Sequence, residues 1–176
     1  RAKGYQVLDS PEAFSADMSR AVALTDADDF DLSSVVERAV TSLSRNPRGY
    51  FLMVEWDLHT DVPKVGLDRA LVLDRVIREV AGKVGRDTLV IFAADHSFDI
   101  RVRNGRQGQP LIVNVPAGEK APDDAPLRVD NGHTGEEVVV TALGPGAERV
   151  RGFIANTDLF RIMMAAFGWE GSPGGR

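Results

Sequence analysis

The sequence predicts an α/β layered sandwich with a mostly parallel central sheet. Three observations support this class: apolar runs of strand length alternate with amphipathic helical segments, the runs are uninterrupted, and polar clusters follow two of them directly. Uninterrupted apolar runs are typical of parallel strands that are covered on both faces. A strand–helix–strand order is typical of α/β folds, and open α/β sheets carry their functional side chains at the carboxyl ends of strands.

In the first half of the chain we expect a strand at residues 5–8, a helix at 32–43 and a buried strand at 50–54. The helix carries apolar residues at helical spacing, and Ser34 with Glu37 forms a capping-box pattern at its start. Residues 9–30 carry no clean period, so we expect a loop with one or two helical turns there.

The second half predicts two further helices and three further strands. The first helix follows Asp61, a plausible N-cap, and the last follows Thr157 in the same role. Residues 99–131 are rich in Gly, Pro and charge, and we expect an excursion there with a single strand. The predicted elements are helices at 63–84 and 157–167 and strands at 88–94, 111–115 and 138–143.

Composition limits the class of protein. The chain has 176 residues, no cysteine and a formal net charge of -5. Without cysteine there is no disulfide framework and no thiolate metal site. The negative charge argues against a nucleic-acid partner, because phosphate backbones attract basic surfaces. No apolar run approaches the ~20 residues of a membrane-spanning helix. We expect one domain over residues 1–170 and a flexible tail at 171–176.

All three histidines lie beside a carboxylate or in a Gly-rich turn. His59 follows Asp57 by two residues, His96 directly follows Asp95, and His133 lies in a turn before a predicted strand. Zinc accepts such a mixture of imidazole and carboxylate ligands. A lone loop histidine is more often a solvated surface residue, and an Asp before a helix is often its cap. The context that all three histidines share nevertheless indicates a dinuclear metal site.

Five motifs resemble the alkaline phosphatase family. They occur in the family's order and span roughly residues 34–168, which makes the set more specific than any single motif. The resemblance implies an alkaline phosphatase-like sandwich that hydrolyses phosphate monoesters with two zinc ions and one magnesium ion. The motifs are Asn46–Glu55 (NPRGYFLMVE), Thr88–His96 (TLVIFAADH), Gly132–Val138 (GHTGEEV), Gly144–Ala147 (GPGA) and Asn156–Phe160 (NTDLF).

The resemblance implies a metal role for six residues. Carboxylates and imidazoles at the family's motif positions would ligate one magnesium and two zinc ions. These residues are Glu55 for magnesium, Asp57, His59 and His133 for the first zinc, and Asp95 and His96 for the second zinc.

Two departures from the family pattern qualify this assignment. Glu55, Asp57 and His59 stand closer together than their family equivalents, so Asp61 is the rival of Asp57 as the zinc carboxylate. No segment of the chain matches the family's nucleophilic serine or phosphate-binding arginine. We therefore expect an incomplete fold, the C-terminal part of one domain, whose nucleophile lies upstream in a missing N-terminal half. The isolated chain is expected to be inactive or nearly so.

Two other readings of the same residues stay open. A phosphomutase or sulfatase of the same superfamily would share the Asp95–His96 strand end and a downstream histidine motif. A non-catalytic metal-binding domain would keep the ligands without chemistry. The family resemblance further implies a phosphate monoester substrate, a homodimer, and a periplasmic or secreted location.

Overall fold

The structure is a computed structural model that describes residues 3–27, 30–58, 60, 62–116 and 119–169. It divides into two compact units. Unit 1 comprises Arg1–Glu55, Arg75–Ile91 and Thr141–Arg176, and unit 2 comprises Trp56–Asp74 and Phe92–Val140. The single domain over residues 1–170 stays a prediction, and the tail at 171–176 lies outside the described residues.

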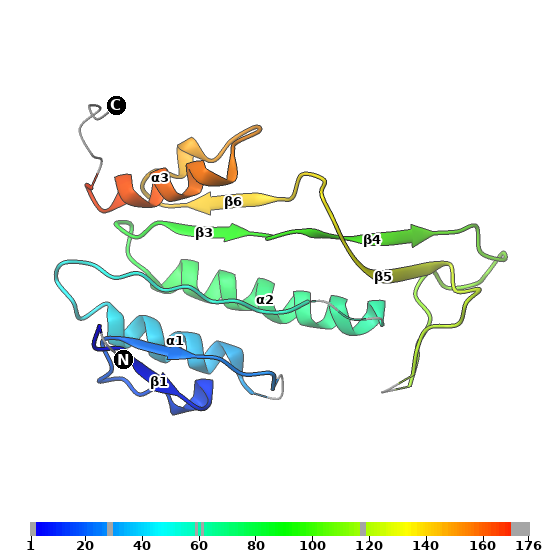
Figure 1. Ribbon diagram of the computed structural model, residues 1–176, viewed down its shortest axis with the longest axis horizontal. Coiled ribbons are helices and arrows are strands. Elements are labelled where there is room, and N and C mark those ends of the chain that lie inside the picture. Colours follow the sequence, from blue (N-terminus) through cyan, green and yellow to red (C-terminus); the bar gives the residue numbers. More distant parts are fainter. Residues whose placement is uncertain (1–2, 28–29, 59, 61, 117–118, 170–176) are drawn as a thin grey trace. The chain divides into compact units, whose positions relative to one another are not determined.

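Three α-helices lie within the described residues, and all three confirm predicted helices (Figure 1). They are α1 (Leu32–Leu43), α2 (Pro63–Lys83) and α3 (Asn156–Ala166). Proline opens α2, where its fixed φ suits a helix and its missing N–H costs nothing. Two single-turn 3₁₀ helices accompany them, η1 (Pro11–Ala13) and η2 (Ala147–Arg149). No helix among the described residues has both the length and the apolar character needed to cross a bilayer.

Six strands within the described ranges form three two-stranded sheets, ordered β1–β2, β3–β6 and β4–β5. The first sheet is parallel and the third antiparallel, and the arrows of β3 and β6 point in opposite directions in Figure 1. The strands are β1 (Gln6–Leu8), β2 (Ala21–Ala23), β3 (Val90–Ala93), β4 (Ser97–Val102), β5 (Leu127–Thr134) and β6 (Val140–Leu143).

The α/β class therefore holds, but the described residues do not form a mostly parallel central sheet. The apolar segment 50–54, predicted as a buried parallel strand, has no strand structure. Phe51 and Met53 in it are 60% and 73% exposed. An apolar run becomes a strand only when a neighbour pairs with its N–H and C=O groups, and no described strand pairs with this one. Segment 111–115, the other predicted strand without a partner, is likewise irregular.

Two regions predicted as irregular contain strands. Residues 9–30 contain the helical turn that was expected there, as η1, but they also contain the strand β2. The excursion over residues 99–131 contains most of β4 and the first half of β5, which pair antiparallel. In both regions a ladder between segments distant in sequence forms the strand, so local composition did not reveal it.

The core of unit 1 lies along one face of α1. Four apolar side chains of α1 are buried, together with Val76 of α2 and Ile162 of α3. The N-cap of α1 is Asp31, whose side chain accepts a hydrogen bond from the Ser34 backbone N–H at 3.2 Å. The predicted box starting at Ser34 is therefore wrong, because Ser34 already lies within the helix. The buried α1 residues are Leu32, Val36, Ala39 and Val40.

The start of α3 also differs from its predicted cap. The N-cap is Ala155 rather than Thr157. The Ala155 backbone N–H donates to the Asp158 carboxylate at 3.2 Å. A side chain in the first turn of the helix therefore provides the hydrogen-bond acceptor for the backbone N–H of the N-cap residue. Thr157 lies within the helix.

An ion pair between Lys83 and Glu37 joins α1 to α2 within unit 1 and lowers the pKa of Glu37. The Lys83 ammonium donates to the Glu37 carboxylate at 2.6 Å. This hydrogen bond, followed by the lysine charge, lowers the pKa of Glu37. A depressed folded-state pKa stabilises the fold above the unfolded-state pKa, and that contribution is lost as pH falls through the folded-state pKa.

Lys83→Met is expected to raise the pKa of Glu37 towards the ordinary glutamate value and to remove this acid-sensitive contribution. The pKa is measured by following the Glu37 carboxyl carbon by NMR during a pH titration. Lys64→Met is the matched control, because Lys64 pairs with Asp68 at 2.7 Å on α2 and not with Glu37. An unchanged Glu37 pKa in Lys83→Met would contradict the ion pair.

Candidate metal centre

The break between β3 and β4 carries the first pair of candidate ligands. β3 ends at Ala93, and its pairing continues for one residue, since the Ala94 N–H donates to the Val139 carbonyl at 3.1 Å. Asp95 and His96 follow, and β4 begins at Ser97. The predicted position of this pair, directly after an apolar strand, is confirmed. The two residues lie in a short irregular link held between paired segments.

The β4–β5 ladder brings the third histidine to the same place. Phe98 is the ladder partner of His133, and Ser97 is the partner of Thr134. A register shift between Phe98 and Asp99 marks an irregularity at this end of the ladder, a feature that often accompanies functional sites. The prediction that His133 lies in a loop before a strand is wrong, because it lies near the end of β5.

Three rings meet at this end of the ladder. The imidazoles of His96 and His133 are stacked, with centroids 3.8 Å apart and planes at 19°. Phe98 meets both rings edge-on, at 5.0 Å from His96 and 5.7 Å from His133. Residues separated by 37 positions in the sequence are thus in direct contact, and the phenyl ring supports both imidazoles.

Both ring nitrogens of His96 face oxygen atoms. Nδ1 lies 3.3 Å from the Ser97 carbonyl oxygen, and Nε2 lies 3.2 Å from Oδ2 of Asp95. A backbone carbonyl at one nitrogen is the arrangement that holds a metal-ligating histidine in one tautomer and leaves the other nitrogen for the ligand. The Asp95 side chain is 84% exposed and that of His96 is 28% exposed, so solvent reaches the carboxylate side of the pair.

The side chains of this cluster are of the types that bind zinc. In the structure, however, they contact one another: the two imidazoles are stacked and Asp95 pairs with His96. Imidazole nitrogens and a carboxylate are zinc ligands. Stacked rings, however, direct their in-plane lone pairs side by side rather than towards one point. Within the described residues, which omit His59, no group of three or more His, Asp or Glu side chains is arranged to hold a metal ion.

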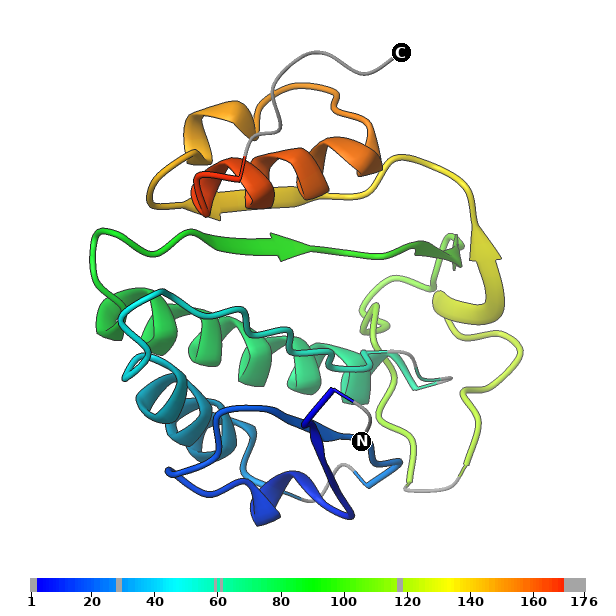
Figure 2. The same ribbon diagram turned by 60° about the vertical axis from the view of Figure 1, so that its left-hand side comes forward.

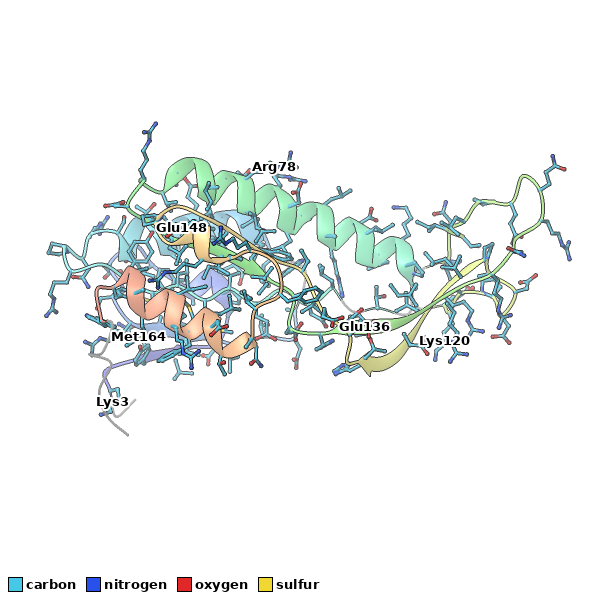
Figure 3. All side chains as sticks on the ribbon, turned by 90° about the horizontal axis from the view of Figure 1, so that it is seen from above. Lys3, Arg78, Lys120, Glu136, Glu148 and Met164 are labelled. Atoms are coloured by element: carbon cyan, nitrogen blue, oxygen red, sulfur yellow. The ribbon has the colours of Figure 1, made fainter. Side chains whose placement is uncertain are left out.

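A carboxylate that the sequence analysis did not single out lies beside the cluster. The hydroxyl of Thr134, then the Glu136 backbone N–H and the hydroxyl of Ser97, lower the pKa of Glu136. Figure 3 labels this side chain on the segment that joins β5 to β6. Ser97 and Thr134 are ladder partners, so the two hydroxyl groups that lower the pKa of Glu136 lie on neighbouring strands.

Among the described residues, neither Glu55 nor Asp57 belongs to a group of three or more side chains that could hold a metal ion. Glu55 and Asp57 are exposed and lie in an irregular segment. Glu55 is the last residue of its stretch of unit 1, and Asp57 belongs to unit 2. His59 and Asp61 lie outside the described residues, so the choice between Asp57 and Asp61 as a zinc carboxylate stays open.

A pattern in the sequence could have identified the ladder that builds the site. Phe98, Ile100 and Val102 alternate with polar residues, as do Leu127 and Val129 further along. Such alternation predicts half-buried antiparallel strands. The ladder pairs Ile100 with Val129 and Val102 with Leu127, so the signal was present in a region that Gly, Pro and charge made appear irregular.

The comparison with known proteins agrees with the motifs. The family model described as "Alkaline phosphatase" matches residues 14–127. Similar proteins include an alkaline phosphatase of Escherichia fergusonii, 31% identical over 79% of this chain and 32% of its own length. The tissue-nonspecific alkaline phosphatase isozyme of Gallus gallus is 38% identical over 70% of this chain and 32% of its own length.

A third relative is the streptomycin-6-phosphate phosphatase of Streptomyces griseus, 32% identical over 69% of this chain and 30% of its own length. The chain therefore spans about a third of the length of the curated relatives it matches. The matched region includes the apolar segment 50–54 and the Asp95–His96 pair. On these matches the chain belongs to the alkaline phosphatase family.

Proposed function

We propose that the polypeptide containing these 176 residues hydrolyses phosphate monoesters with the help of bound metal ions. The observation that carries the proposal is the contact between His96 and His133 beside Asp95, at the end of the β4–β5 ladder. Family membership supports a phosphatase-type hydrolase, and all the relatives named above are phosphatases.

In this proposal six side chains hold the metals. When bound, two zinc ions and one magnesium ion would supply Lewis-acid stabilisation of the phosphoryl oxygens and a water of lowered pKa. The stacked pair of imidazoles would have to turn so that each ring directs a nitrogen to its own ion. The proposed ligands are Asp57, His59 and His133 for one zinc, Asp95 and His96 for the other, and Glu55 for magnesium.

Neighbouring groups of this chain would prepare those ligands. The Ser97 carbonyl faces Nδ1 of His96, which leaves Nε2 for a metal. Phe98 packs against the edges of both imidazoles and would help to hold the two rings in place. Glu136, whose pKa is lowered by the hydroxyls of Thr134 and Ser97, would add a negative charge near the metals.

The nucleophile is proposed to come from the rest of the polypeptide. The chain covers about a third of its relatives' length, and no segment of it matches the family's nucleophilic serine. A missing N-terminal half of the same polypeptide would supply that serine and the remaining ligands. A homodimer and a periplasmic or secreted location are further parts of this proposal.

The test compares the complete polypeptide with the isolated 176-residue chain. With zinc and magnesium added, the complete polypeptide is expected to hydrolyse p-nitrophenyl phosphate, and the isolated chain is expected to show turnover near the buffer rate. The absence of a nucleophile is the reason for this difference, and colour release measures it.

Three outcomes distinguish the alternatives. Robust turnover by the isolated chain would show that the nucleophile lies within it. Faster hydrolysis of p-nitrophenyl sulfate than of the phosphate would indicate a sulfatase, and transfer of the phosphoryl group to a sugar hydroxyl would indicate a phosphomutase. Metal binding by the complete polypeptide with no turnover on any of these substrates would indicate a non-catalytic metal-binding domain.

A further inference from the structure

The parallel sheet of unit 1 exposes one apolar face. Val7 of β1 is the ladder partner of Val22 of β2, and the two side chains are 57% and 40% exposed. Side chains alternate between the two faces of a strand, so Tyr5 and Leu24 extend the same face at its two ends. They are 46% and 80% exposed. We call these four side chains, Tyr5, Val7, Val22 and Leu24, the β1–β2 face.

The opposite face of the same sheet is partly buried. Leu8, Ala21 and Ala23 are half-buried, and the segment that links the two strands is tied to α1. The Arg38 and Arg45 guanidinium groups donate to the carbonyls of Phe14 and Ala16 at 3.2 and 2.8 Å. The Ser42 hydroxyl of α1 donates to the Met18 carbonyl. The link between the two strands is therefore tied to α1, and Figure 2 shows this part of unit 1 in blue.

A parallel sheet with one open apolar face is unusual. Parallel sheets occur almost only where both faces are covered, and the covering elements are helices. Contiguous exposed apolar side chains mark a surface that another element occupies. The described residues of unit 1 supply no second covering layer for this face, because all four of its side chains stay exposed.

We propose that an amphipathic helix from the part of the polypeptide outside residues 1–176 packs on the β1–β2 face. The relatives are about three times as long as this chain, which covers 32% of the Escherichia fergusonii protein, so ample polypeptide exists in proteins of this family to supply the layer. The inference rests on exposure and family length, and it is independent of the metal ligands.

Thiol labelling of the complete polypeptide tests whether the face is covered. The 176 residues contain no cysteine, so Val22→Cys adds one thiol to the face once any cysteine elsewhere is replaced by serine. Glu12→Cys, at an exposed position of η1, is the matched control. With 5,5′-dithiobis(2-nitrobenzoic acid), the Val22→Cys thiol is expected to react about 100-fold more slowly than the control, because reaction requires local opening.

Two results of the labelling would overturn the proposal. A Val22→Cys rate within about threefold of the control would mean an open face. Protection that disappears on hundredfold dilution of the protein would identify the occupant as a second copy of the chain. Val7→Cys repeats the measurement at the ladder partner and keeps the test valid if one variant fails to fold, as far-UV circular dichroism would reveal.

Photocrosslinking identifies the occupant directly. Tyr5 is replaced by p-benzoylphenylalanine in the complete polypeptide, and the irradiated protein is digested and analysed by mass spectrometry. The expected adduct links position 5 to a peptide from outside residues 1–176. The crosslinked protein is expected to run at the mass of a monomer on a denaturing gel. An adduct within residues 1–176, an adduct at dimer mass, or no adduct would overturn the proposal. Phosphatase activity is not part of either readout, so failure here leaves the proposed function untouched.

Discussion

His96→Ala in the complete polypeptide is expected to lower kcat/KM for p-nitrophenyl phosphate by more than about 100-fold, the upper end of what loss of an outer-shell partner costs a metal site. Of the candidate ligands that the structure describes, His96 is the best positioned. Its Nδ1 faces the Ser97 carbonyl, its Nε2 faces Asp95, and its ring stacks on His133. Removing the imidazole would take away one proposed ligand and the packing partner of another.

Metal content separates loss of a ligand from loss of packing. Bound zinc, measured by inductively coupled plasma mass spectrometry after gel filtration, is expected to fall by at least one ion per chain in His96→Ala. Phe98→Leu removes the ring that supports both histidines and keeps both imidazoles, so it is expected to retain zinc. If His96→Ala keeps its full zinc content and activity, His96 is not a ligand.

Asp123→Asn is the control for a charge change in the same unit. Its carboxylate is 97% exposed and pairs with Arg128 of β5 at 3.2 Å. Exposed pairs of this kind contribute little to stability, and Asp123 has no proposed contact with substrate or metal. Its activity and zinc content are expected to match those of the unaltered protein. A loss in this variant equal to that of His96→Ala would point to a general effect of altering unit 2.

Local signals in the sequence predicted the helices well. Helical spacing located α1, α2 and α3 within a few residues of their bounds, because each has one apolar face that its own residues define. Their caps were less predictable. Asp31 rather than Ser34 caps α1, and Ala155 rather than Thr157 precedes α3. Several residues near a helix start could act as the cap, and the chain path that enters the helix selects one.

The strands show the limit of local reasoning. Segment 50–54 has the composition of a buried strand, yet it has no ladder partner in the described structure. β2 has only three residues and no strong local signal, yet the register with β1 makes it a strand. Strand formation depends on a second segment, and the sequence of one segment does not contain that information.

The candidate site was predictable in its residue types and not in its geometry. The Asp95–His96 pair after a strand and the three shared histidine contexts indicated which residues could form a metal site. The stacking of His96 on His133 follows from the β4–β5 register, which pairs Phe98 with His133. That register is a property of two segments about thirty residues apart, so the contact could not be inferred from either motif alone.

Gly144→Ala is expected to destabilise unit 1 by roughly 3 kcal/mol or more, from the combined costs of a left-handed backbone and an overpacked contact. Gly144 follows β6 with φ of 95°. A Cβ atom at this position would lie 2.1 Å from the Thr88 carbonyl oxygen. The obstacle is backbone, which cannot rotate away as a side chain can. The free energy of unfolding in urea, measured by circular dichroism, gives the loss.

Gly152→Ala separates the two costs. Gly152 has φ of 64°, also left-handed, but no atom lies within 4 Å of a Cβ built there. Only the backbone cost of about 1–2 kcal/mol applies. The difference between the free energies of unfolding lost in the two variants therefore measures the cost of the close contact between Gly144 and Thr88. Thr88 lies just before β3 and Gly144 just after β6, so this contact fixes how closely the two paired strands come together at their ends. Equal losses in the two variants would mean that the contact is absent and that the β3–β6 pairing ends earlier than described.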